Sequence, residues 1–204
     1  MNIKFNCIIA GIAGQGTSLI SHVIGEAALE HGHDVCGSDT SGLSRQGCDV
    51  VSHLRLGQHV NSPLIPQGKA HLLIALDPAE AVRYHSFLSA AGRLLVLDRA
   101  AEGGEKYDPA EMLEFLSSYM TRPSTERYAR KYEGRWFEII DTASLVEKCG
   151  SPAFLNVALL GAAAEKKFLP LGPDDILATL KKQVPAEALE AHIRAFDAGR
   201  GLAE

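Results

Sequence analysis

The stretch Ile3–His31, IKFNCIIAGIAGQGTSLISHVIGEAALEH, decides the fold. Its first part, Ile3–Ala10, is mostly apolar, which is typical of a buried strand. A glycine-rich turn follows at Gly11–Gly16, and Thr17–His31 then carries apolar residues at helical spacing. A buried strand, a glycine turn and a helix in this order predict the opening unit of an α/β domain.

The remainder of the chain alternates between short apolar runs and helical patterns. Further strands are expected at Asp34–Gly37, Val50–Leu56, Leu72–Leu76, Arg93–Leu97 and Trp136–Asp141. Further helices are expected at Pro78–Ala90, Asp108–Met120, Thr142–Lys148, Ser151–Phe168, Asp174–Gln183 and Ala186–Ala198. This alternation predicts a single α/β domain over residues 1–204. We expect a three-layer, Rossmann-like domain with a mainly parallel sheet centred on the first strand and a helical C-terminal tail.

Composition and charge exclude several classes of protein. The chain has 204 residues, of which 46% are hydrophobic and 22% charged, so it is neither disordered nor collagen-like. Its net charge of −5 provides no global basic field for nucleic acid. The apolar runs are far shorter than the roughly 20 residues of a membrane span, and the first residues lack the pattern of a signal peptide. We therefore expect a cytoplasmic protein with neither a membrane nor a nucleic-acid partner.

One segment departs from the acidic average. Arg122–Trp136 combines basic residues with interleaved aromatic ones. Charge runs of this kind are usually solvated, so we interpret the segment as an exposed helix or as a surface that faces a partner.

The cysteines and histidines, which are common metal ligands, do not have the spacing of a metal site. The four cysteines, Cys7, Cys36, Cys48 and Cys149, form no C-x-x-C pair, and the eight histidines lack the H-E-x-x-H pattern. We therefore expect this chain alone to hold no metal ion and no iron–sulfur cluster. Neither a G-x-S-x-G elbow nor a G-K-[ST] phosphate loop is present, so the catalytic residues remain unknown.

The glycine turn is the strongest candidate for a binding site. Gly11 is expected to allow a tight turn, and Gly14 and Gly16 to let an anion approach the free N–H groups at the start of the helix. The spacing is G-x-x-G-x-G and not the dinucleotide pattern G-x-G-x-x-G. Two alternatives stay open: a nicotinamide-nucleotide site that uses Asp39 as the ribose acid, and a turn that only packs helix against strand or meets another subunit.

A polar loop, Ser38–Gly47, is the second candidate. It follows the second expected strand, so in a parallel sheet it would emerge at the carboxyl edge beside the glycine turn, where such sheets bind ligands. Arg45 could pair with a carboxylate or a phosphate through its planar guanidinium group. The plainer alternative is that Arg45 is an exposed residue that caps a helix or contacts a partner.

Taken together, these segments resemble the gamma-type component of 2-oxoacid:ferredoxin oxidoreductases. That family opens with a strand and G-x-G-G-Q-G, which Gly11–Gly16 matches except at Ala13, and its next helix ends in A-A-x-x-x-G. The corresponding later segments are Ala27–Gly32, Ser38–Gly47, Val50–Arg55, Ser62–Gly68, Leu72–Pro78, Asn156–Gly161 and Ala195–Gly199.

The resemblance implies an oxidoreductase subunit that is inactive alone. In such enzymes a 2-oxoacid, here indolepyruvate or another aryl pyruvate, is oxidatively decarboxylated, coenzyme A takes the acyl group and ferredoxin takes the electrons. Thiamine diphosphate and iron–sulfur clusters belong to a partner, a large subunit with a ferredoxin domain, through which ferredoxin is reached. The implied cofactor-binding residues of this chain are Gly11, Gly14, Gln15, Gly16, Ser41, Arg45 and Gly47.

Two other functions compete with this one. The chain could be a free-standing NAD(P)-type oxidoreductase, or a structural subunit without a ligand. Tight NAD(P) binding by the isolated chain would favour the first, and a neighbouring gene for a thiamine- and ferredoxin-domain protein would favour the oxidoreductase subunit.

Overall fold

A computed structural model describes residues 4–40, 48–98, 111, 114 and 137–202. Its strands form a six-stranded sheet in the order β2-β3-β1-β4-β5-β6. The strands are β1 (Phe5–Ile12), β2 (Asp34–Asp39), β3 (Asp49–Gly57), β4 (Ala70–Ala75), β5 (Leu88–Leu97) and β6 (Phe137–Ile140). The α-helices are α1 (Thr17–Glu30), α2 (Pro78–Tyr84), α5 (Thr142–Cys149), α6 (Leu155–Glu165), α7 (Pro173–Gln183) and α8 (Leu189–Arg200).

Most strands of the sheet run in the same direction, as predicted. β4 is parallel to both β1 and β5, and β5 is parallel to β6. β3 is antiparallel to its two neighbours, β1 and β2, so β2 again runs in the direction of β1. The carboxyl ends of β1 and β2 therefore lie at the same edge of the sheet, with the start of β3 between them.

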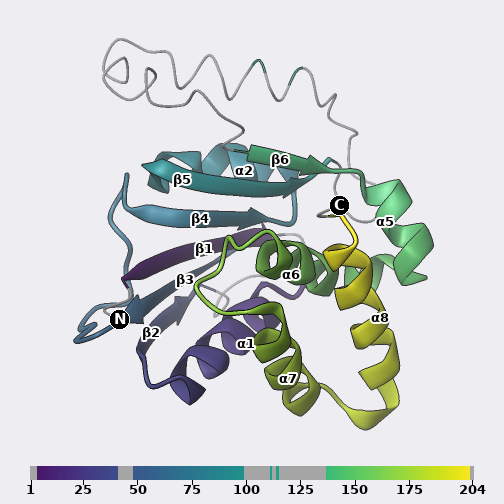
Figure 1. Ribbon diagram of the computed structural model, residues 1–204. Helices are drawn as coiled ribbons and strands as arrows, with labels where there is room; N and C mark the ends of the chain where they lie inside the picture. The colour runs from purple at the N-terminus through teal and green to yellow at the C-terminus, as the bar shows by residue number, and fades with distance from the viewer. Residues whose placement is uncertain (1–3, 41–47, 99–110, 112–113, 115–136, 203–204) are drawn as a thin grey trace.

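The sheet is covered on both faces, which confirms the three-layer prediction. Helices α1, α5, α6, α7 and α8 pack on one face, and α2 packs on the other (Figure 1). The side chains of β1 alternate between the two layers: Cys7 and Ile9 face the larger helical layer, whereas Ile8 and Ala10 face α2. A helical C-terminal tail that packs on the sheet is thus also confirmed.

Helix α6 lies in the middle of the larger layer and is buried on nearly all sides. Two glycines let it approach α8 closely. A Cβ atom on Gly161 would overlap the carbonyl oxygen of Phe196, and a Cβ atom on Gly199 would overlap the carbonyl oxygen of Ala158. The close approach of the two backbones therefore depends on both glycines.

Several predicted boundaries are wrong. β1 extends past Ala10 to Ile12, and β2 extends to Asp39, so the polar loop begins later than Ser38. The helix expected at Pro78–Ala90 ends at Tyr84, because the chain turns through a 3-10 segment at His85–Phe87 and Leu88 already pairs with β4.

Two of the C-terminal helices, α6 and α8, begin later than predicted. Short 3-10 turns at Pro152–Phe154 and Ala186–Ala188 precede α6 and α8. The helix predicted at Asp108–Met120 lies almost entirely outside the described residues, as does the whole basic segment Arg122–Trp136. Within the part of the chain that the structure describes, no helix combines the length and the apolar character that a membrane crossing requires.

Candidate functional site

The glycine turn joins β1 to α1 at the carboxyl edge of the sheet. Gly14 and Gly16 have φ angles of 100° and 82°, in the left-handed region that glycine adopts without steric strain. Gly14 is exposed, and a Cβ atom added to it would meet nothing within 4 Å. The turn therefore presents its backbone at Gly14, without side-chain cover from the described residues, close to the point where α1 begins.

The side chain of Gln15 stabilises this turn from inside. Its Oε1 accepts the hydrogen of the Ile12 backbone N–H at 2.8 Å, and the backbone N–H of Gln15 donates to the carbonyl oxygen of Ile12 at 3.0 Å. Gly11 is buried within β1, and a Cβ atom there would lie 2.8 Å from Gln15 Oε1. Gly11 thus makes room for the folded glutamine, while the turning is done by Gly14 and Gly16.

The start of α1 has the electrostatics of an anion site. Gly16 is the N-cap residue, no side chain in the described residues caps the helix, and no acidic residue lies in its first turn. The free N–H groups and the positive end of the helix dipole favour a bound negative charge. Behind the turn, the buried Asn156 of α6 donates from Nδ2 to the carbonyl oxygen of Gly16 at 3.4 Å.

One end of the predicted polar loop lies beside the glycine turn, and the other end lies one strand further out at the same edge of the sheet. The backbone N–H of Ala13 donates to the carbonyl oxygen of Cys48 at 2.9 Å, and Asp49 pairs with Ile12. At the other end of the loop, Thr40 exchanges hydrogen bonds with Val51: its N–H donates to the Val51 oxygen at 3.1 Å, and its Oγ1 accepts from the Val51 N–H at 3.0 Å. The two residues that flank the loop in the structure, Thr40 and Cys48, therefore lie at the carboxyl edge of the sheet, where the loop was expected.

Three of the predicted site residues belong to the loop itself. Ser41, Arg45 and Gly47 lie outside the described residues, so their predicted roles remain proposals. Gly11, Gly14, Gln15 and Gly16 are brought together in the single turn described above.

Asp39 is not placed as in a dinucleotide-binding domain. There, the acid that binds the ribose follows the strand adjacent to the glycine-turn strand. Here β3 lies between β1 and β2, so Asp39 is separated from β1 by two strand spacings, or roughly 9.5 Å, instead of one. This separation does not favour the nicotinamide-nucleotide alternative.

Buried acidic residues, which the sequence analysis did not single out, line the same edge of the sheet. Asp77 Oδ1 accepts from the N–H of Ala79 at 2.8 Å and so caps α2, while Asp98 Oδ1 accepts from the N–H of Thr142 at 3.0 Å. The Asp77-Pro78 pair is a helix-start signal that could have revealed the first of them. These carboxylates hold helix starts in place, so their role is structural.

Glu80 is a further buried acid near this edge. Its carboxylate accepts from Arg83 Nε at 3.2 Å, and burial raises its pKa above the usual range, against the opposing effect of the arginine. No group of three or more His, Cys, Asp or Glu side chains suited to a metal ion occurs among the described residues. The four cysteines are free thiols, with Cys48 exposed at the edge of the site.

Comparison with known proteins decides the family. The model of the family "Pyruvate ferredoxin/flavodoxin oxidoreductase" matches residues 6–202. The chain belongs to this family. Among curated members, it is similar to "Indolepyruvate oxidoreductase subunit IorB" of Thermococcus kodakarensis, with 28% identity over 196 residues, 96% of this chain and 94% of that protein. The IorB subunit of Archaeoglobus fulgidus is likewise 28% identical over 197 residues, 97% of this chain and 94% of that protein.

Solved structures with low sequence identity share the fold. The gamma subunit of a keto/oxoacid ferredoxin oxidoreductase from Geobacter sulfurreducens matches with a TM-score of 0.65 and 18% identity over 98% of this chain and 99% of that one. The 2-oxoglutarate:ferredoxin oxidoreductase of Magnetococcus marinus, solved with 2-oxoglutarate, coenzyme A and succinyl-CoA bound, matches with a TM-score of 0.70 and 17% identity. That match covers 100% of this chain but 31% of the longer one. In that relative, a fold of this kind is one part of a larger chain.

Proposed function

We propose that this chain is the gamma-type, non-cluster subunit of a 2-oxoacid:ferredoxin oxidoreductase that acts on indolepyruvate or another aryl pyruvate. In the complete enzyme the 2-oxoacid loses its carboxylate as CO2, two electrons pass to ferredoxin and the acyl group is transferred to the sulfur of coenzyme A. The substrate class is supported by the IorB relatives, which match this chain over nearly its full length.

One structural observation carries the proposal: a glycine turn, exposed at Gly14, leads into a helix start that no described side chain caps, at the carboxyl edge of the sheet. Coenzyme A carries phosphate groups, and helix N-termini with free N–H groups are suited to bind phosphate. In this proposal the N–H groups at Gly14 and Gly16 and the guanidinium of Arg45 hold one such anion together.

The remaining residues of the site have supporting roles. Gln15 and Gly11 keep the turn in shape through the Gln15–Ile12 hydrogen bonds, and Ser41 and Gly47 place the loop that carries Arg45. The described residues offer no metal-ligand group, and the proposal assigns thiamine diphosphate and the iron–sulfur clusters to the large partner subunit. Cofactors of that kind perform the electron chemistry, while this chain supplies binding and orientation.

We further propose that residues 1–204 form a single gamma-type domain, which is supported by one sheet that both helical layers share. We place the assembly in the cytoplasm, where the exposed thiol of Cys48 would remain reduced.

Reconstitution tests the function. The chain is purified alone and together with its large subunit, and the reduction of ferredoxin is measured with indolepyruvate and coenzyme A. We expect activity that needs both subunits and coenzyme A. A complex that turns over without this chain, or a lone chain that binds NAD(P) tightly, would contradict the proposal.

A further inference from the structure

A hollow of about 300 Å³ opens between α1 and the edge strand β2. Its apolar lining includes Leu29, Val35 and Leu54, and its polar lining includes Glu26 and Asp39. The hollow lies between α1 and the face of the sheet formed by β2 and Leu54 of β3, beside β2, which is the first strand in the sheet order, and it contains no residue of the glycine turn.

Two glycines line this hollow at positions where neither the backbone conformation nor the packing requires glycine. Neither Gly25, in the middle of α1, nor Gly37, in β2, has a positive φ angle. A Cβ atom on Gly25 would make ordinary contacts with Val35 and Leu54 at 3.4 and 3.6 Å, and one on Gly37 would have its nearest neighbour, the His53 backbone oxygen, at 3.7 Å. Glycine weakens both helices and strands, and within a strand it often marks the close approach of another backbone.

The edge strand beside the hollow is open. All residues of β2 are exposed or half-buried, whereas the interior strands are mostly buried, so the outer ladder of β2 is free of partners among the described residues. Leu29, on the rim, is 50% exposed, and the only other large hydrophobic residue as exposed within the described chain is Leu64 at 61%. An open strand edge beside an apolar hollow is the geometry to which an extended peptide adds as a further strand.

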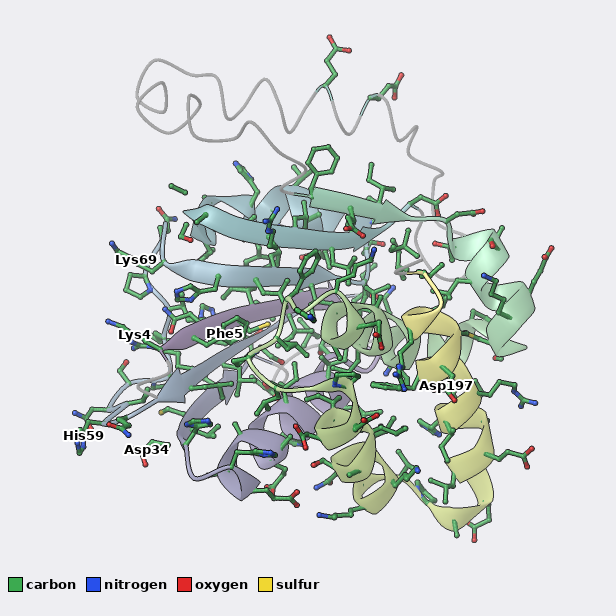
Figure 2. The ribbon with its side chains drawn as sticks, viewed as in Figure 1. Lys4, Phe5, Asp34, His59, Lys69 and Asp197 are labelled. Carbon is green, nitrogen blue, oxygen red and sulfur yellow. The ribbon has the colours of Figure 1, made fainter. Side chains whose placement is uncertain are left out.

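The charges around the hollow select the partner. Among the described residues, its lining carries Glu26, Asp39 and the titratable His22, and no lysine or arginine. Asp34, at the other end of β2, lies at the surface where it accepts the N–H of His59 at 2.7 Å (Figure 2). If two copies of β2 paired antiparallel along their full length, Asp34 would lie opposite Asp39 at both ends, and directly opposed like charges are destabilising. The edge therefore disfavours self-association and favours a basic segment.

We propose that this hollow and the β2 edge dock an extended segment of the large partner subunit, with an apolar side chain in the hollow and lysine or arginine residues facing Asp34 and Asp39. The proposal rests on the proposed function for the identity of the partner. Main-chain hydrogen bonds to β2 would provide affinity, and the hollow and the flanking carboxylates would provide specificity.

A matched pair of leucine variants tests the surface. Leu29→Ala and Leu64→Ala each remove one exposed leucine, and only Leu29 lines the hollow. The dissociation constant of each variant for the purified large subunit is measured by calorimetry. We expect Leu29→Ala to raise it about ten- to hundredfold, as expected for one leucine buried at an interface, and Leu64→Ala to leave it unchanged.

Gly37→Val and the milder Gly37→Ala test the close approach. A β-branched side chain suits a strand, so the melting temperature of the lone chain should hold or rise, while affinity for the large subunit falls at least tenfold. Amide hydrogen exchange should slow in β2 when the complex forms.

The outcomes separate this inference from the proposed function. An active complex in which Leu29→Ala and Leu64→Ala bind alike and β2 exchange is unchanged overturns the docking surface alone. A wild-type chain that does not bind the large subunit overturns both.

Discussion

Asn156, at the start of α6, donates its Nδ2 hydrogen to the carbonyl oxygen of Gly16 at 3.4 Å, across a separation of 140 residues. The same side chain uses Oδ1 to accept from the N–H of Val157 at 2.9 Å. One buried amide therefore joins the C-terminal helical layer to the glycine turn, and the conformation of the turn depends on the packing of a distant helix.

Replacing Asn156 with Ala should loosen this turn. The loss of the hydrogen bond to Gly16 should lower the free energy of unfolding by about 1–2 kcal/mol in urea titrations and raise the KM for coenzyme A in the reconstituted enzyme. Ser151→Ala is the control, because Ser151 caps the 3-10 turn before α6 through the N–H of Ala153 and its side chain forms no hydrogen bond with the glycine turn among the described residues. It should lower stability slightly and leave that KM unchanged; equal KM effects from both variants would contradict the proposed link.

The α6–α8 contact should be the least tolerant of added volume. Gly161→Ala and Gly199→Ala each drive a Cβ atom into a backbone carbonyl of the other helix, which can relieve the clash only by moving away. We expect each to lower the free energy of unfolding by about 3 kcal/mol or more. Gly25→Ala, where a Cβ atom fits, should raise it by up to about 1 kcal/mol, and both effects are measured by chemical denaturation. Folded, equally stable Gly161 and Gly199 variants would contradict the packing described here.

Arg45→Ala tests the proposed anion site. Loss of a charge-assisted contact costs about 1.5–3 kcal/mol, so the KM for coenzyme A, or the dissociation constant of the assembly, should rise by about one to two decades. The melting temperature should change little, because a single loop arginine contributes little to folding. Arg194→Ala, on the exposed surface of α8, is the matched control. If both variants behave like the wild type, Arg45 has no part in the site.

The isolated chain should be colourless and without redox activity. Its described residues provide no metal-ligand group, and its cysteines lack cluster spacing. Iron analysis of purified protein should give substoichiometric values, and indolepyruvate should not be turned over without the large subunit. Stoichiometric iron or turnover by the chain alone would overturn the assignment of the clusters to the partner.

His53 should make stability depend on pH. Its ring is nearly buried and accepts the N–H of Ile65 at Nδ1, at 3.2 Å, and burial lowers its pKa below the ordinary value of about 6.5. The unfolded chain then binds the proton more readily than the folded one. Stability is therefore fully present above about pH 6.5 and is lost as the pH falls toward the lowered pKa, by at most about 1.4 kcal/mol per pH unit.

Urea titrations between about pH 7.5 and 5.5 measure this effect, with His53→Gln as the reference. The variant should show a flatter dependence, although not a flat one, because burial also lowers the pKa of His71. A wild type and a variant with the same slope would show that His53 does not contribute.

Local errors in the sequence prediction have identifiable causes. Ser89, Ala90 and Ala91 are small residues compatible with a helix, yet this segment belongs to β5. Pairing with β4 makes this segment a strand. Leu88 pairs with Ala70, and the register of the two strands shifts between Ala70 and Leu72. Gly92 fits at this irregularity because a Cβ atom there would lie only 2.9 Å from the Ala70 carbonyl oxygen. Pairing with a neighbouring strand is a tertiary interaction, so local propensity did not reveal it.

The amino-acid sequence by itself determined the strand–turn–helix unit at the start of the chain, the alternation that makes an α/β fold, and the glycines that shape the candidate site. Each of these depends on local periodicity or on backbone freedom, which a short segment contains. Only the tertiary structure decided that β3 separates β1 from β2, that Asn156 supports Gly16, and that Gly25 and Gly37 line one hollow. These relationships join residues distant in the chain, and they arise from strand order and helix packing, which no local pattern encodes.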